Sequence, residues 1–120
     1  MQFIFDGEFY KVTRVTGVSY NFLAISFGEN ANGLVDIEGL KINDEEKEFI
    51  FEKSVKEQVL LGLNEINNEL ATNYKVEKIQ FIVSDTPSDI IYRNLIKEIV
   101  MYKETHPAIQ MVLCDLNKSS

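Results

Sequence analysis

The hydrophobic pattern of this chain changes its period once, near residue 54, and that change limits the folds the chain can adopt. Before it, apolar and polar residues alternate, as along residues 21–27 and 35–38, which is the period of a β-strand. After it, apolar residues recur at intervals of three or four, which marks one face of a helix. These residues are Val55, Val59, Leu63, Ile66 and Leu70. The pattern predicts an α+β fold, with a strand-rich first half followed by helices.

The first half begins with a hairpin signal. Asp6 and Gly7 lie between two aromatic runs, and both residue types suit a two-residue turn. Such a turn would place Ile4 opposite Phe9, and the second strand would continue to about Val15. With residues 21–27 and 35–38 added, the simplest arrangement is an antiparallel meander of about four strands.

The boundary between the two halves is ambiguous, because residues 44–53 could form a strand, a helix or a loop. Ser54 and Glu57 have the spacing of a capping box, which predicts a helix over 54–71. Residues 47–52 are then predicted as a strand. Gly62 falls on the buried stripe of the helix, where its missing side chain predicts close backbone contact with the sheet.

A second helix is predicted after a strand at residues 75–83. Thr86 suits its N-cap and Pro87 its first position, and His106 followed by a proline marks its end. A last strand is predicted at 108–114, which would make the C-terminal part a βαβ-like unit.

The domain organisation follows from these elements. We expect one globular domain, 1–120: a strand-rich part at 1–53, helix–strand–helix–strand at 54–116 and a frayed tail at 117–120. A mainly antiparallel sheet would carry two amphipathic helices on it.

Composition narrows the class of protein. The chain has one histidine (His106), one cysteine (Cys114), no tryptophan and a net charge of -7. A lone cysteine forms no internal disulfide and fits no paired-cysteine metal site, which favours a reducing compartment. The N-terminus lacks the features of a signal peptide, and no apolar run reaches the roughly 20 residues of a membrane helix. We therefore expect a soluble cytoplasmic domain without a cofactor.

The negative charge is concentrated in residues 44–73, which hold eight acidic against three basic residues. Binding to a phosphate backbone or to an anionic membrane depends on lysine and arginine, so neither nucleic acid nor membrane is an expected partner. A basic protein is the partner that this charge favours.

One residue on the first helix stands out. With Val59 at the centre of the buried stripe, a rotation of 100° per residue places Leu61 about 200° away, on the outward face. An isolated exposed leucine is common and needs no function. A leucine ringed by polar side chains also resembles a small binding patch with an apolar anchor. That patch would consist of Glu57, Leu61, Asn64, Glu65 and Asn68.

A carboxylate metal site is the alternative. It would use Asp6, Glu57, Asp85 and Asp115, which follow predicted strands or open a predicted helix. Their order, an Asp-Gly pair, a helix glutamate and a post-strand aspartate, resembles that of ribonuclease H-type nucleases. The resemblance implies Mg²⁺-dependent phosphoesterase or nuclease activity. The chain departs from the family pattern because its Asp-Gly pair lies in a predicted tight turn.

Taken together, size, acidity and missing catalytic groups predict a small non-enzymatic protein-binding domain. The most concrete version is an immunity- or antitoxin-like inhibitor of a basic toxin or nuclease domain. The metal phosphoesterase is the alternative, and a homo-oligomeric subunit is a third interpretation.

Overall fold

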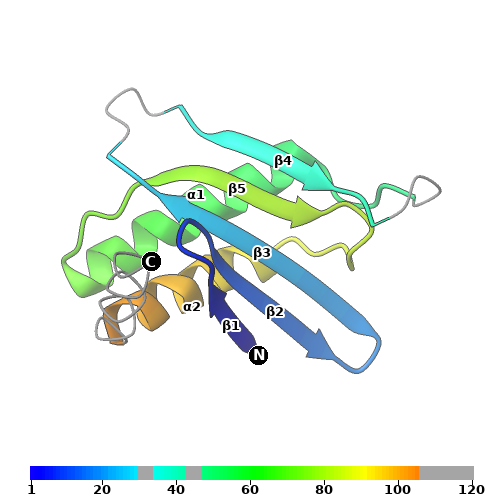
Figure 1. Cartoon of the computed structure of the whole chain (residues 1–120), viewed down its shortest axis with the longest axis horizontal. Coiled ribbons are helices and arrows are strands. Elements are labelled where there is room, and N and C mark those ends of the chain that lie inside the picture. Colours follow the sequence, from blue (N-terminus) through cyan, green and yellow to red (C-terminus); the bar gives the residue numbers. More distant parts are fainter. Residues whose placement is uncertain (30–33, 43–46, 106–120) are drawn as a thin grey trace, which may run out of the picture.

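The computed structural model describes residues 1–29, 34–42 and 47–105, which form a five-stranded sheet with two helices on one face (Figure 1). The predicted α+β architecture is confirmed. In chain order the elements are β1 (Gln2–Phe5), β2 (Tyr10–Thr16), β3 (Ser19–Phe27), β4 (Asp36–Leu40), α1 (Glu52–Leu70), β5 (Val76–Ile82) and α2 (Ile91–Thr105). None of the helices in these ranges is long and apolar enough to span a membrane.

The strand order is β1-β2-β3-β5-β4. The first three strands form the expected antiparallel meander, but the fourth does not extend it. β4 lies at the sheet edge and is parallel to β5, which is inserted between β3 and β4. The reason is α1, which connects β4 to β5: a helical crossover returns the chain parallel to the strand it left. The βαβ unit of the described residues is therefore β4–α1–β5, and the predicted strand at 108–114 lies outside them.

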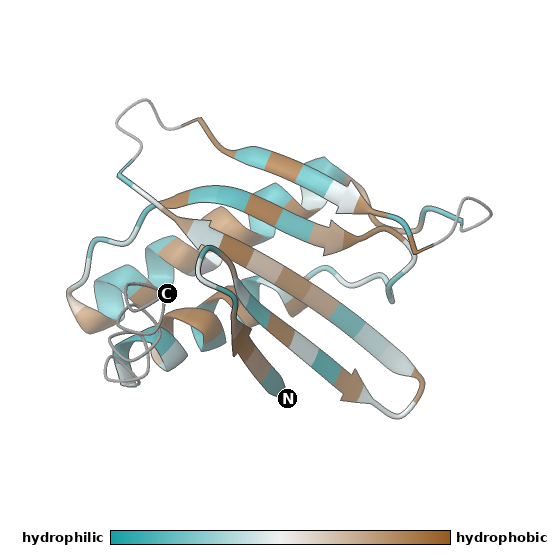
Figure 2. Ribbon diagram, viewed as in Figure 1, coloured by the Kyte–Doolittle hydropathy of each residue, from teal (hydrophilic) through white to brown (hydrophobic). Residues whose placement is uncertain are grey.

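Strand alternation places one set of apolar side chains against the helices. Val12 is paired with Leu23 and Leu23 with Phe81, and all three are at most 1% exposed. Figure 2 shows the alternation of apolar and polar residues along β4 and β5. Within the described ranges the other face of the sheet has no helix on it, so the core of this part of the chain lies in a single layer between sheet and helices.

The helices meet this face with the stripes predicted from their periodicity. Val55, Val59, Leu63 and Ile66 of α1 are buried, and Leu70 is half-buried. In α2 the buried residues are Ile91, Tyr92, Leu95, Ile96, Ile99 and Val100. α1 contacts β4 and β5, whereas α2 contacts β2 and β3.

At Gly62 the two helices are in close contact. A Cβ atom there would lie 2.4 Å from the carbonyl oxygen of Arg93 and 2.6 Å from Cγ2 of Ile96, both in α2. The predicted close approach is present, but its partner is the other helix and not the sheet.

The hairpin between β1 and β2 differs from the two-residue turn predicted. Phe5 is opposite Tyr10 and Ile4 opposite Lys11, so four residues form the loop. Oδ1 of Asp6 accepts hydrogen bonds from the backbone N–H of Glu8 (2.9 Å) and Phe9 (2.7 Å). The N–H of Asp6 also donates to the carbonyl of Phe9 (3.2 Å), so the turn is centred on Gly7 and Glu8, one residue later than predicted. Asp6 precedes this turn, where its side chain forms an Asx-type arrangement.

The start of α1 also differs from the prediction. Residues 47–51 form no strand; they are an extended connection in which the N–H groups of Phe49 and Ile50 donate to the carbonyl of Val83. The helix begins at Glu52, and its N-cap residue, Phe51, makes no side-chain capping hydrogen bond. Ser54 lies inside the helix and not at its N-cap. The burial of Ile50 and its bond to Val83 determine where the helix can begin, and they override the local capping signal.

α2 begins at Ile91, four residues later than the predicted first position at Pro87, for a similar reason. The N–H and the hydroxyl oxygen of Thr86 are bonded to the carbonyl and the N–H of Tyr20 in β3, so Thr86 continues the sheet and does not cap the helix. Ser88 takes that role instead, because its Oγ accepts from the N–H groups of Ile90 (3.2 Å) and Ile91 (3.1 Å).

Candidate functional site

The outward face of α1 contains four of the five residues predicted as a binding patch. Leu61 is 49% exposed, as its position on the helix predicted. Glu57, Asn64 and Asn68 are exposed around it. Leu60, which was not part of the predicted patch, is 38% exposed beside it. We call the exposed set Glu57, Leu60, Leu61, Asn64 and Asn68 the α1 outer face.

Glu65 does not belong to this face, which corrects its predicted place. Its carboxylate accepts hydrogen bonds from Nε and an Nη of Arg93, and the ammonium of Lys97 lies 3.4 Å away. Arg93 and Lys97 belong to α2, so Glu65 joins the two helices. The hydrogen bonds from Arg93 lower the pKa of Glu65 below its usual value.

This difference arises from the close approach at Gly62. Because α2 lies against that side of α1, the neighbouring residues 58 and 65 face α2 and not solvent. A helical wheel centred on the sheet-facing stripe does not contain this information, since it does not say which flank a second helix will cover.

The three described residues of the alternative metal site, Asp6, Glu57 and Asp85, are not brought together. Asp6 lies in the β1–β2 loop, where its carboxylate caps the loop, and Glu57 faces solvent on α1. Asp85 is 5% exposed beyond the end of β5, and its Oδ2 accepts from the N–H of Phe22 at 2.7 Å. Asp115 lies outside the described residues. Within residues 1–29, 34–42 and 47–105, no three His, Cys, Asp or Glu side chains are grouped to hold a metal ion.

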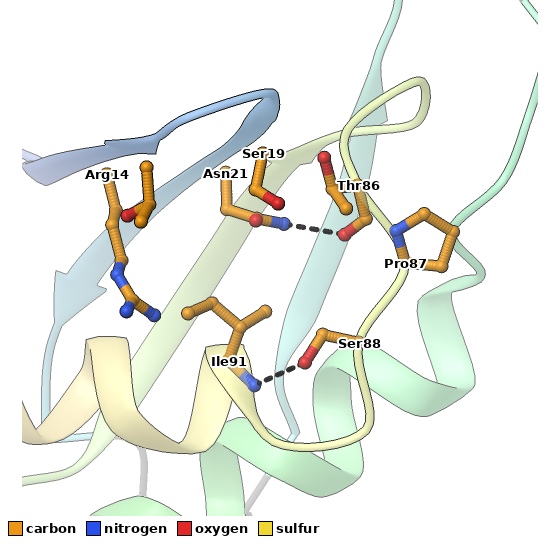
Figure 3. A pocket seen from close by; sticks show the side chains of 8 residues that line it. Arg14, Ser19, Asn21, Thr86, Pro87, Ser88 and Ile91 are labelled. Atoms are coloured by element: carbon orange, nitrogen blue, oxygen red, sulfur yellow. Dashed lines mark hydrogen bonds between the residues drawn. The ribbon is translucent and has the colours of Figure 1, made fainter.

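A polar hollow of about 260 Å³ lies where the β2–β3 hairpin meets the connection into α2 (Figure 3). Asn21 donates from Nδ2 to the carbonyl of Thr86 (2.8 Å) and to the hydroxyl of Tyr92 (3.3 Å). Arg14 from β2 and Ser88 from the connection also line it.

The polar side chains around this hollow serve the fold. Gln58 of α1 donates to the carbonyl of Ser88 (2.9 Å) and accepts from the N–H of Tyr92 (3.1 Å). Asn21, Gln58 and Asp85 are all at most 7% exposed. Burial raises the pKa of Tyr92 well above its ordinary value, so its hydroxyl remains protonated at neutral pH. These groups hold the connection before α2 against β3 and α1, and we call them the polar junction.

Comparison with protein-family models, curated proteins and solved structures finds no match for this chain.

Several exposed apolar residues were not predicted from the sequence. Leu34 and Ile42, on either side of β4, are 70% and 71% exposed, and Phe49 and Phe51 are 50% and 65% exposed. The alternating pattern had marked 35–38 as a strand, but only the strand order shows that it lies at an edge. Since these residues lie next to β4 and α1, we take the side of the molecule formed by β4 and α1 as the candidate binding region. The polar junction lies on the side of α1 that faces α2.

Proposed function

We propose that this chain is a small, non-enzymatic domain that binds a basic protein, and that the α1 outer face is part of its binding surface. The observation that carries this proposal is Leu61, an apolar side chain that is half exposed on a helix and surrounded by a carboxylate and two amides. An apolar anchor with a polar rim is the usual anatomy of a protein interface.

The helix that presents this surface is well fixed. The side of α1 that faces α2 is tied to it by Gln58 and by the Glu65–Arg93 pair, and the buried stripe packs on the sheet. A rigid surface loses little conformational entropy on association, which favours affinity.

The net charge of -7 supports a basic partner. Opposite net charges steer two proteins together and raise the association rate, and the effect weakens as salt screens it. The most concrete form of the proposal is an immunity- or antitoxin-like inhibitor, which would bind a basic toxin or nuclease domain.

The test begins with affinity capture from the native host at physiological salt, followed by titration of the purified partner by calorimetry. We expect a basic protein that binds stoichiometrically and loses affinity when the salt concentration rises. Leu61→Arg should weaken this binding by about tenfold or more, because it places a cation at the anchor. Val15→Arg is the matched control, since Val15 is 61% exposed on β2, away from α1.

Two results would overturn the proposal. One is a purified partner that binds wild type and Leu61→Arg equally well. The other is a rise in melting temperature with Mg²⁺ that Asp85→Asn abolishes while the variant remains folded, since that behaviour belongs to the metal phosphoesterase.

A further inference from the structure

The edge of the sheet at β4 is a second feature of the proposed binding side. Within the described part of the chain, β4 is paired with β5 alone, so its other edge has unpaired backbone N–H and C=O groups. Proteins usually protect such an edge with charged side chains, lysine above all, with proline or with a bulge. Residues 36–40 contain neither lysine nor proline, and their register with β5 is regular from Asp36 to Leu40.

Apolar side chains continue beyond this edge in the helix layer. Gln58, Gly62 and Glu65 mark the side of α1 that faces α2. Leu60 lies about 200° from Gln58 around the helix, so it is on the flank away from α2. Since α1 covers β4 and β5 while α2 covers β2 and β3, this flank borders the β4 edge. A sixth strand beside β4 would therefore cover Leu60, which is now 38% exposed.

The charges on β4 indicate what kind of strand fits. Asp36 is paired with Lys78 and Glu38 with Gln80, and both acidic side chains are exposed. They lie on the sheet face opposite to Ile37, whose partner Ile79 is buried against the helices. A strand added here would meet carboxylates on one face and apolar side chains on the other.

The same charges disfavour a second copy of this chain as the occupant. Two β4 strands paired edge to edge would bring the acidic side chains of one copy next to those of the other, and like charges on adjacent strands are destabilising. A basic segment gains from the same carboxylates.

The other edge strand, β1, fits a basic segment less well. It has only four residues and none is charged. Its Phe3 is stacked on Tyr102 of α2, with ring centroids 4.7 Å apart, and its Phe5 on Tyr10 of β2, so the two aromatic side chains of that edge already have partners.

We propose that the β4 edge accepts an extended segment of a basic partner protein as a sixth strand, with lysine or arginine alternating with apolar residues. This inference rests on the proposed function and specifies how the partner docks. Main-chain hydrogen bonds would supply affinity, and the alternating side chains would supply specificity through Asp36, Glu38 and Leu60.

The probe for this proposal is a synthetic peptide of about eight residues in which lysine alternates with valine, a length suited to one strand. We expect saturable NMR shifts confined to residues 34–41 and Leu60, with increased protection of β4 amides from hydrogen exchange. A peptide with the same sequence but N-methylated backbone amides should lose binding. Equal binding of both peptides, or shifts spread over acidic residues throughout the molecule, would overturn strand addition.

A charge exchange provides the matched variant. Asp36→Lys/Glu38→Lys should weaken the lysine–valine peptide by about tenfold or more and should create binding to a glutamate–valine peptide. A dispersed NMR spectrum shows that the variant is folded. If β4 amides in the wild type instead become protected as protein concentration rises without peptide, a second copy occupies the edge and the proposal is wrong.

The two proposals can fail separately. If a natural basic partner binds the charge-exchanged variant as tightly as wild type but is lost with Leu61→Arg, the binding function stands and strand addition fails. If the alternating peptide binds β4 but a purified partner binds Leu61→Arg as tightly as wild type, strand addition stands and the α1 outer face is not part of the binding surface.

Discussion

The two flanks of α1 show how one helix can serve both folding and recognition. The flank facing α2 contains Gln58, Gly62 and Glu65, and each of these residues has a specific contact there. The other flank, called the outer flank below, is the α1 outer face. It contains Leu60 and Leu61, which are 38% and 49% exposed. The residues of the first flank contact α2, whereas the side chains of the second flank are exposed to solvent and free to contact a partner protein.

The exposure and the polarity of a side chain together distinguish a residue that joins elements of the fold from one that is available to a partner. Polar residues on the inner flank are used to join elements, so their polarity indicates no ligand. Apolar side chains on the outer flank contribute little hydrophobic free energy to folding because they remain in water. Burial against a partner would recover that free energy, so these residues indicate a binding surface. Substitutions on the two flanks should therefore separate stability from recognition.

The largest effect is expected at Gly62. Gly62→Ala should lower the free energy of unfolding by about 3 kcal/mol, because the new Cβ would overlap the carbonyl oxygen of Arg93 at 2.4 Å. This loss outweighs the gain of about 1 kcal/mol that alanine brings to a helix interior. Urea unfolding measures the change, with Asn64→Ala on the outer flank as the control. Equal stability of Gly62→Ala and wild type would show that the helices do not approach so closely.

The next effect is expected at Gln58. Gln58→Ala should cost about 2 kcal/mol, since it leaves the N–H of Tyr92 and the carbonyl of Ser88 without their partner. Amide hydrogen exchange should localise the change to the connection before α2. Glu57→Ala, one residue away on the outer flank, should leave the same amides as protected as in wild type, and a similar loss there would remove the contrast between flanks.

Acidification should weaken the inner flank through Glu65. Arg93 lowers the pKa of Glu65 in the folded chain below its ordinary value of 4.5, so the pair stabilises the fold above that pH. The contribution is lost as the pH falls and the carboxylate becomes protonated. Glu65→Gln should therefore make the stability less dependent on pH below about 4.5, as followed by thermal unfolding across that range. An unchanged pH profile would show that the ion pair contributes nothing in solution.

The smallest effect on stability is expected at Leu61. Leu61→Ser should change the free energy of unfolding by at most about 0.5 kcal/mol, because half of its side chain is already in water. The same variant should reduce affinity for the basic partner, as measured by calorimetry. A large loss of stability would place Leu61 with the inner flank and would remove the contrast.

The sequence predicted much of the fold because short-range patterns define most of its elements. The sheet-facing stripe of α1 and the strands at 21–27 and 75–83 follow from periodicity, which depends only on neighbouring residues. The predicted starts of both helices were wrong, because Thr86 and Ile50 form long-range hydrogen bonds to Tyr20 and Val83. A capping pattern involves only neighbouring residues, so it does not predict hydrogen bonds to residues far away in the sequence.

The candidate site was predictable in part for the same reason. Leu61 could be placed outside because it lies opposite the stripe, whereas the place of Glu65 depended on where α2 packs. The position of β4 at the edge of the described sheet could not be predicted either, because strand order is set by the crossover through α1 and not by the composition of residues 36–40.

That strand order has a consequence for synthesis on the ribosome. The chain emerges from its N-terminus, so β3 and β4 are both made before the only strand that lies between them. Until residue 82 has left the exit tunnel, the nascent chain can complete the β1–β2–β3 meander but has no site for β4. β5 can therefore pair with both of its neighbours only after the whole of α1 has been synthesised.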